Sequence, residues 1–183
     1  HFLWISERDG YNHLYLYAND GTPVGRLTSG DWDVTEFLGA DEDAGLIYFV
    51  STMKGSTERH VYRQRVDLTN GTSTAAPERL TPDAGWNGAD LSRDRRYFLH
   101  TRSTLDTPTI VSLRRTDGTL VKTLEDNADL AATLDSYAMG TTEMTMTPGA
   151  DGTDLNTLLI KPSTFDASRE YPVLMFVYGG PGS

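Results

Sequence analysis

The chain has 183 residues, of which 26 are acidic and 16 basic, and its formal net charge of −10 argues against a nucleic-acid partner, since phosphate binding depends on clustered Lys and Arg. Its 38% of hydrophobic and 10% of aromatic residues are enough for a packed core, and its length suits one domain or slightly more. It contains no cysteine, which excludes a disulfide framework, a thiolate zinc site and a cysteine nucleophile.

The first part of the chain reads as short strands. It begins without an initiator Met or the pattern of a signal peptide, so we expect it to begin inside a larger protein. Segments rich in aromatic and β-branched residues predict strands at residues 14–17, 46–50, 60–62, 96–99 and 109–113. The Asp-Gly and Asn-Gly dipeptides of tight turns stand at residues 9–10, 20–21, 70–71 and 117–118. This part is therefore predicted to be all-β.

An internal repeat runs through the same part. Arg-Leu-Thr at residues 26–28, followed by Trp32, recurs at residues 79–81, followed by Trp86. A repeat of about 50 residues is close to that of four-stranded propeller blades, and we expect the two Trp residues to pack between blades. Two and a half units cannot close a ring, so we interpret residues 1–126 as the C-terminal part of a β-propeller. A β-sandwich with coincidental turn spacing is the alternative.

Other polar features of the chain point to structure rather than to a site. The histidines lack the spacing of metal ligands, and we expect structural or surface roles for His1, His13, His60 and His100. The acidic runs at residues 41–43 and 151–154 do not fit a calcium loop. We read Asn70 as part of a turn rather than a glycosylation site. No metal or organic cofactor is expected.

The character of the chain changes near Asn127. Residues 127–134 predict one short helix with Asn127 as its N-cap, and we expect this helix to mark a domain boundary. Residues 142–146 and 156–160 predict a hairpin. The continuously apolar run at residues 171–178 is typical of a strand that is buried on both faces of an α/β sheet.

A glycine-rich turn follows that run at residues 179–182. Glycine lets a backbone approach a ligand closely, and in α/β-hydrolases a turn after the third strand contributes to the oxyanion hole. A phosphate-binding loop fits less well, because neither Gly-Lys-Ser/Thr nor the dinucleotide spacing is present.

Four stretches together resemble the dipeptidyl peptidase IV family of serine peptidases, in the order that the family has. They are WISERDGYNHLYLY (4–17), LTSGDWDV (27–34), LEDN (124–127) and YPVLMFVYGGPGS (171–183). The resemblance covers essentially the whole chain. It implies a mainly β chain in which residues 1–126 are the last blades of an eight-bladed propeller. Residues 127–183 would then be a linker and the first strands of an α/β-hydrolase domain.

The resemblance also implies a role for Tyr178. In that family the tyrosine before the glycine turn donates its hydroxyl to the oxyanion of the tetrahedral intermediate, and Tyr178 matches its position. Without the resemblance, Tyr178 would be read as an aromatic residue that caps a buried strand. The chain has no Gly-x-Ser-x-Gly elbow, and Ser183 is not part of such a motif. The chain also stops before the region where the family has its catalytic Ser, Asp and His. This fragment alone is therefore predicted to be inactive.

Activity and partners are expected from the family. The resemblance implies a serine exopeptidase that releases N-terminal dipeptides with Pro or Ala second, with peptide substrates, a homodimeric full-length enzyme and a periplasmic location. A related propeller that binds partners without catalysis is the alternative. A second alternative is another branch of the same peptidase clan, such as the acylaminoacyl peptidases or the oligopeptidases. The segments at residues 124–127 and 178–183 favour the dipeptidyl peptidase branch over these.

Overall fold

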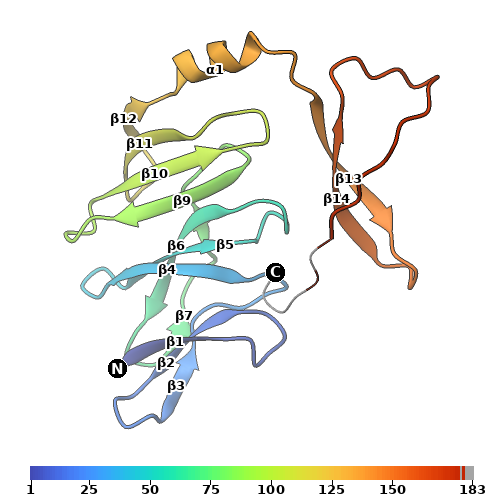
Figure 1. Cartoon of the computed structure of the whole chain (residues 1–183). Coiled ribbons are helices and arrows are strands. Elements are labelled where there is room, and N and C mark those ends of the chain that lie inside the picture. Colours follow the sequence, from blue (N-terminus) through green and yellow to red (C-terminus); the bar gives the residue numbers. More distant parts are fainter. Residues whose placement is uncertain (178, 180–183) are drawn as a thin grey trace. The chain divides into compact units, whose positions relative to one another are not determined.

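The chain forms two compact units. The computed structural model describes residues 1–177 and residue 179. The units are His1–Leu134, which holds three antiparallel sheets, and Asp135–Ser183, which holds a two-stranded hairpin (Figure 1). The division between the compact units falls after Leu134, whereas the boundary expected at residue 126 between propeller and hydrolase domain stays a prediction.

Each sheet of the first unit is antiparallel and is built from strands that follow one another in sequence. The first sheet contains β1 (Phe2–Ser6), β2 (His13–Tyr17) and β3 (Pro23–Arg26). The second contains β4 (Val34–Asp41), β5 (Leu46–Ser51), β6 (His60–Asp67), β7 (Thr72–Ser73) and β8 (Glu78–Arg79). The third contains β9 (Trp86–Leu91), β10 (Tyr97–Ser103), β11 (Ile110–Arg115) and β12 (Leu120–Glu125). The five predicted strands are all present, so the all-β prediction for this part is confirmed.

The core lies between consecutive sheets, and β5 contributes to it from both of its faces. Ile47 and Phe49 belong to a cluster shared with the first sheet. Tyr48 and Val50 belong to a second cluster, which includes Phe98 of the third sheet. Because side chains alternate along a strand, a continuously apolar strand can fill two interfaces at once.

The sequence repeat is also a structural repeat. Thr28 and Thr81 are both buried, and each accepts the backbone N–H of a strand residue, Leu14 at 3.0 Å and Val61 at 3.1 Å. Each threonine Oγ1 also lies 3.0 Å from a buried histidine Nδ1, on His13 and His60 respectively. The Leu-Thr dipeptide therefore supplies a hydroxyl that joins the residue pair after β3 to β2 in the first sheet, and the pair after β8 to β6 in the second.

The two repeated Trp residues do not occupy equivalent places, and the expectation that both pack between blades is wrong for Trp86. Trp32 stacks on Phe49 with ring centroids 5.9 Å apart, whereas Trp86 is 58% exposed. Val34 and Asn87 are the equivalent positions, because each donates its backbone N–H to the residue that precedes the buried histidine. Trp32 stands two residues before Val34 and Trp86 one residue before Asn87. In extended chain, a one-residue offset turns a side chain to the opposite face.

The predicted helix is present as α1 (Ala128–Asp135). The Asn127 carbonyl accepts the first helical hydrogen bond, from Ala131 at 2.9 Å, as an N-cap residue does. Its side chain does not cap the helix, however, because Nδ2 donates to the Thr109 carbonyl. Asp126 Oδ1 accepts the N–H of Ala128 instead, at 3.0 Å. The helix prediction is confirmed, and the side-chain part of the cap assignment is wrong.

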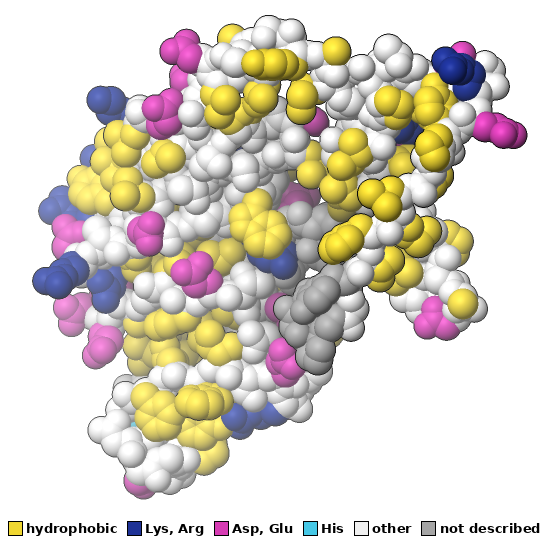
Figure 2. Space-filling model, viewed as in Figure 1, with side chains coloured by type: hydrophobic (Ala, Val, Ile, Leu, Met, Phe, Trp, Pro, Cys, Tyr) yellow, Lys and Arg dark blue, Asp and Glu magenta, His cyan; other side chains and the backbone are white. Residues whose placement is uncertain are grey.

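The second unit contains the predicted hairpin, formed by β13 (Thr141–Pro148) and β14 (Asp154–Lys161). Cross-strand partners share a face of a hairpin, and the pairs Met144–Leu158 and Thr142–Ile160 give one apolar face. Figure 2 shows hydrophobic side chains gathered over this hairpin. The opposite face carries an ion pair of 2.7 Å between Lys161 and Glu143.

Residues 171–177 do not form the strand that their apolar sequence predicts. They have no regular secondary structure, and Leu174 is 96% and Phe176 89% exposed. A strand of a parallel sheet needs hydrogen-bonding neighbours from other segments, and no described residue pairs with this run. The prediction of a buried strand is therefore wrong for this chain. Among the described residues, no helix is long and apolar enough to cross a membrane.

Candidate functional site

The predicted oxyanion donor, Tyr178, lies outside the described residues, and its role stays a prediction. The segment before the apolar run is folded on itself. Tyr171 stacks on Phe165 with centroids 5.2 Å apart, and its hydroxyl accepts the backbone N–H of Asp166 at 2.9 Å. The described residues of the second unit thus place no catalytic group, although they lead directly to the position of Tyr178.

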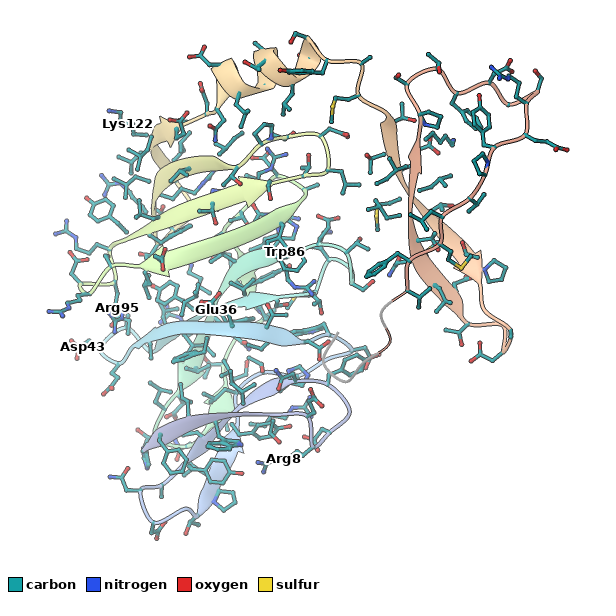
Figure 3. All side chains as sticks on the ribbon, viewed as in Figure 1. Arg8, Glu36, Asp43, Trp86, Arg95 and Lys122 are labelled. Carbon is teal, nitrogen blue, oxygen red and sulfur yellow. The ribbon has the colours of Figure 1, made fainter. Side chains whose placement is uncertain are left out.

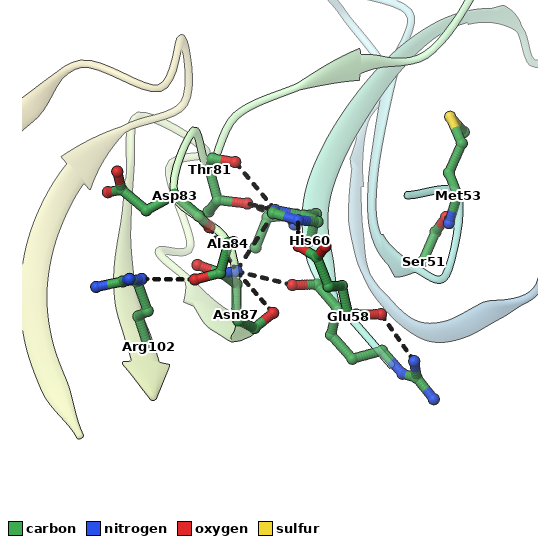
Figure 4. A network of polar contacts seen from close by, with 12 residues as sticks. Ser51, Met53, Glu58, His60, Thr81, Asp83, Ala84, Asn87 and Arg102 are labelled. Carbon is green, nitrogen blue, oxygen red and sulfur yellow. Dashed lines mark hydrogen bonds and ion pairs between the residues drawn. The ribbon is translucent and has the colours of Figure 1, made fainter. Parts of the chain in front are cut away.

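A buried polar network connects the second and third sheets (Figure 4). Glu58 Oε2 lies 2.9 Å from His60 Nε2, and the other ring nitrogen faces Thr81. This carboxylate–imidazole–hydroxyl order is the order of a catalytic triad. Thr81 is fully buried, however, and its Oγ1 already accepts the Val61 N–H. No substrate can reach it, so the arrangement serves structure. The His60 hydrogen bond also lowers the pKa of Glu58.

Asn87 extends this network to the third sheet. It is fully buried, and its Nδ2 donates to the Arg59 carbonyl at 2.8 Å. Its Oδ1 lies 2.8 Å from His100 Nε2, while Arg114 Nε donates to His100 Nδ1 at 3.2 Å. Since Arg114 can only donate, Nδ1 is the acceptor and Nε2 carries the proton. Burial, followed by the charge of Arg114, lowers the pKa of His100 to about 4.

The three buried histidines therefore have the structural role that was expected of them. His13 follows the same scheme as His60, with Nε2 3.0 Å from the Gly30 carbonyl and Nδ1 next to Thr28. Burial lowers the pKa of His13 as well. Within the described part of the chain, no group of three or more His, Asp or Glu side chains could hold a metal ion.

A pocket of about 460 Å³ lies where the segment before β4 meets the β5–β6 loop, and we call it the end pocket. Ten residues line it: Tyr11, Asp31, Trp32, Asp33, Thr52, Met53, Lys54, Gly55, Ser56 and Arg59. Its frame is hydrogen-bonded. Asp33 exchanges two bonds with Thr52, at 2.9 and 3.0 Å, and its Oδ1 accepts the Asn12 N–H at 2.8 Å. Its lining includes an exposed acidic residue, Asp31, and an exposed basic residue, Lys54.

Arg59 is the most constrained cation of the end pocket. Its guanidinium carbon lies 4.5 Å from the ring centroid of Trp86, which stands at the start of β9 (Figure 3). Its Nη1 donates to the carbonyls of Ser56 at 3.0 Å and Glu58 at 2.8 Å. Burial lowers the pKa of Arg59, and the charge of Asp33 opposes that shift. No sequence motif marks Arg59, because its environment comes from three separate segments of the chain.

Stacked antiparallel sheets of three to five short strands, built in sequence order with a repeated hydrogen-bonding scheme, define a propeller type of β protein. The comparison with known families agrees with this class. Residues 1–109 match the family described as "Dipeptidyl peptidase IV (DPP IV) N-terminal region". This match covers more than half of the chain, so the chain belongs to that family.

Curated relatives carry names of the same kind. The chain is 34% identical to "Probable dipeptidyl-aminopeptidase B" of Aspergillus clavatus, with 95% of the chain and 19% of that protein covered. It is 33% identical to "Probable dipeptidyl peptidase 4" of Aspergillus flavus, with 100% of the chain and 23% of that protein covered. The chain thus spans about a fifth of the length of these relatives.

A solved structure confirms the mainly β architecture. The crystal structure of Porphyromonas gingivalis dipeptidyl peptidase 4 superposes with a TM-score of 0.83 at 35% sequence identity, covering 93% of this chain and 23% of that one. The fold is thus similar to the propeller region of a dipeptidyl peptidase 4, and the resemblance seen in the sequence is confirmed. The assignment of residues 127–183 to an α/β-hydrolase domain stays a prediction.

Proposed function

We propose that this chain is part of a serine exopeptidase that releases N-terminal dipeptides, with Pro or Ala second, from peptides. The observation that carries the proposal is the family match of residues 1–109, together with relatives that are themselves named dipeptidyl peptidases. In this proposal, residues 127–183 begin the hydrolase domain. The full-length enzyme would be a homodimer outside the cytoplasm, most simply in the periplasm, and would use no metal or organic cofactor.

The proposed chemistry places Tyr178 at the oxyanion. A serine that lies outside these 183 residues attacks the peptide carbonyl, and its proton passes to a histidine as negative charge develops on the carbonyl oxygen. The Tyr178 hydroxyl donates a hydrogen bond to that oxygen. Such a donor stabilises the transition state more than the ground state, because the charge is present only in the transition state.

The variant Tyr178→Phe in the full-length protein tests this role. We expect kcat on an X-Pro substrate to fall about 10²–10³-fold with KM nearly unchanged, as for other oxyanion donors. Tyr171→Phe is a matched control in the same segment, because within the described part of the chain the Tyr171 hydroxyl bonds only to nearby backbone, and kcat should be nearly unchanged. An unchanged kcat in Tyr178→Phe would remove this residue from the mechanism.

The alternative function is a binding module without catalysis. It predicts that the full-length polypeptide lacks a Gly-x-Ser-x-Gly elbow and cleaves no X-Pro or X-Ala peptide. Mass spectrometry of the native protein beyond residue 183, together with an assay of dipeptide release, distinguishes the two functions. An elbow serine whose replacement by alanine abolishes release supports the peptidase.

A further inference from the structure

We propose that the end pocket is a subsite for the carboxylate of a peptide, with the Arg59 guanidinium as its main ligand. The inference rests on the proposed function, since it takes peptides as the molecules on which the full-length protein acts. It concerns residues of the first unit only and assigns Arg59 a role in peptide selection rather than in bond cleavage.

Arg59 is held in place before any ligand binds. Its backbone N–H donates to the Gly85 carbonyl at 3.1 Å, and its carbonyl accepts two hydrogen bonds from Asn87, at 3.0 and 2.8 Å. Stacking on Trp86 and the bonds from Nη1 then fix the plane of the guanidinium. A preorganised cation loses less conformational freedom when it binds a ligand.

The Arg59 guanidinium also has donors that no described residue uses. Among the described residues, its side-chain hydrogen bonds all leave from Nη1, and none of the ion pairs includes it. Two of the nearby carboxylates have other partners, because Glu58 is bonded to His60 and Asp33 Oδ1 to the Asn12 N–H. Nε and Nη2 can therefore form the two parallel bonds by which a guanidinium binds a carboxylate.

The charges that line the end pocket favour a carboxylate over other anions. Lys54 adds a second cation on the β5–β6 loop, whereas Asp31 and Asp33 lie on the segment before β4. The lining is thus formally neutral, and it disfavours a multiply charged anion such as phosphate more than a singly charged planar carboxylate. A volume of about 460 Å³ is suited to one or two residues of a peptide.

Binding of uncleavable peptides tests the proposal directly. In calorimetry with the full-length protein, we compare N-acetylated peptides that carry Glu or Gln at one position, each with a C-terminal acid or amide. We expect either the Glu peptide to bind about tenfold more tightly than the Gln peptide, or the C-terminal acid about tenfold more tightly than the amide, because a carboxylate forms charge-assisted hydrogen bonds. The Arg59→Gln variant should abolish this preference for the carboxylate. Arg59→Lys keeps the charge but not the planar pair of donors, and should restore only part of it.

Arg8→Gln is the matched control. Arg8 is also stacked on an aromatic ring, with its guanidinium carbon 4.3 Å from the Tyr15 centroid, but it does not line the end pocket (Figure 3). Its replacement should leave the preference for the carboxylate unchanged. The Glu/Gln and acid/amide arms show whether a side chain or a chain terminus supplies the group.

Three results would overturn the proposal. The first is equal binding of acidic and neutral peptides by the unaltered protein, and the second is an Arg59→Gln variant that folds normally and keeps the preference. Failure of the proposed function looks different, because X-Pro peptides would then remain uncleaved whether or not the acetylated peptides bind. Inorganic phosphate that competes as well as acetate would indicate a general anion site and would also contradict the subsite.

Discussion

At the scale of single residues, the three buried histidines of the first unit have polar partners at both ring nitrogens. His100 is 3% exposed and lies between Asn87, which accepts from its Nε2, and Arg114, which donates to its Nδ1. Only the neutral imidazole can satisfy both partners at once. His13 and His60 are buried as well, and the Nδ1 atom of each lies next to a threonine hydroxyl. A buried histidine of this kind specifies structure and makes stability depend on pH.

We expect protonation of His100 to destabilise the first unit in mild acid. Its pKa is about 4 in the folded chain and near 6.5 in the unfolded chain, so the unfolded state binds the proton first as the pH falls. The contribution is present above about pH 6.5 and is lost progressively down to about pH 4, by roughly 3 kcal/mol in total. Urea unfolding of the chain at several pH values measures it.

His100→Gln is the variant that isolates this effect. Glutamine keeps one donor and one acceptor but does not titrate, so the free energy of unfolding should fall less between pH 6.5 and pH 4 than in the unaltered chain. His1→Gln, at an exposed position, should leave the pH dependence as it is. The same slope in all three proteins would show that His100 does not carry it.

At the scale of elements, consecutive sheets are joined by close contacts as well as by apolar packing. A Cβ at Gly25 in β3 would stand 2.0 Å from the Gly71 carbonyl oxygen, and one at Gly71 would stand 2.6 Å from the Gly25 nitrogen. Gly71 also has a φ of +65°, in the region that favours glycine. Two glycines therefore let the backbone of the first sheet touch the β6–β7 turn of the second.

Gly25→Ala tests the importance of this contact. We expect it to lower the free energy of unfolding by about 1–3 kcal/mol, because the added methyl group overpacks a backbone contact that cannot yield without shifting a sheet. Gly21→Ala is the comparison, since Gly21 has a φ of +87° but open space around its Cβ, and it should cost less, about 1 kcal/mol. The melting temperatures of the two variants and of the unaltered chain, measured by thermal unfolding, compare these two losses of stability. Equal melting temperatures for Gly25→Ala and the unaltered chain would contradict the close approach.

At the scale of the whole molecule, the excess of acidic residues affects the stability of the fold. The chain spans about a fifth of its curated relatives, and both described core clusters lie in the first unit. Its net charge is −10, and only three ion pairs of an Arg or Lys with a carboxylate join the described residues. Repulsion among carboxylates should therefore outweigh attraction in the folded state.

We expect moderate salt to stabilise this chain. Raising the ionic strength from low to physiological values shortens the screening length to about 8 Å, which weakens long-range repulsion more than contact ion pairs. The free energy of unfolding should rise by about 1 kcal/mol or less. Urea titrations in NaCl and KCl check this, and a glycerol control of matched osmolality separates screening from solvent exclusion. A decrease with both salts would show that attraction dominates.

Features that depend on local backbone preference can be predicted from the amino-acid sequence. Aromatic and β-branched runs, Asp-Gly turns and the helix after Asn127 are encoded within a few residues, and they were predicted correctly. Its motifs also determined the family. The tertiary structure alone decided which side chains meet, such as Thr81 with His60 or Arg59 with Trp86, and that a one-residue offset exposes Trp86 but not Trp32. It also showed that the apolar run at residues 171–177 is no strand here, because a strand is completed by neighbours distant in sequence, which local patterns do not specify.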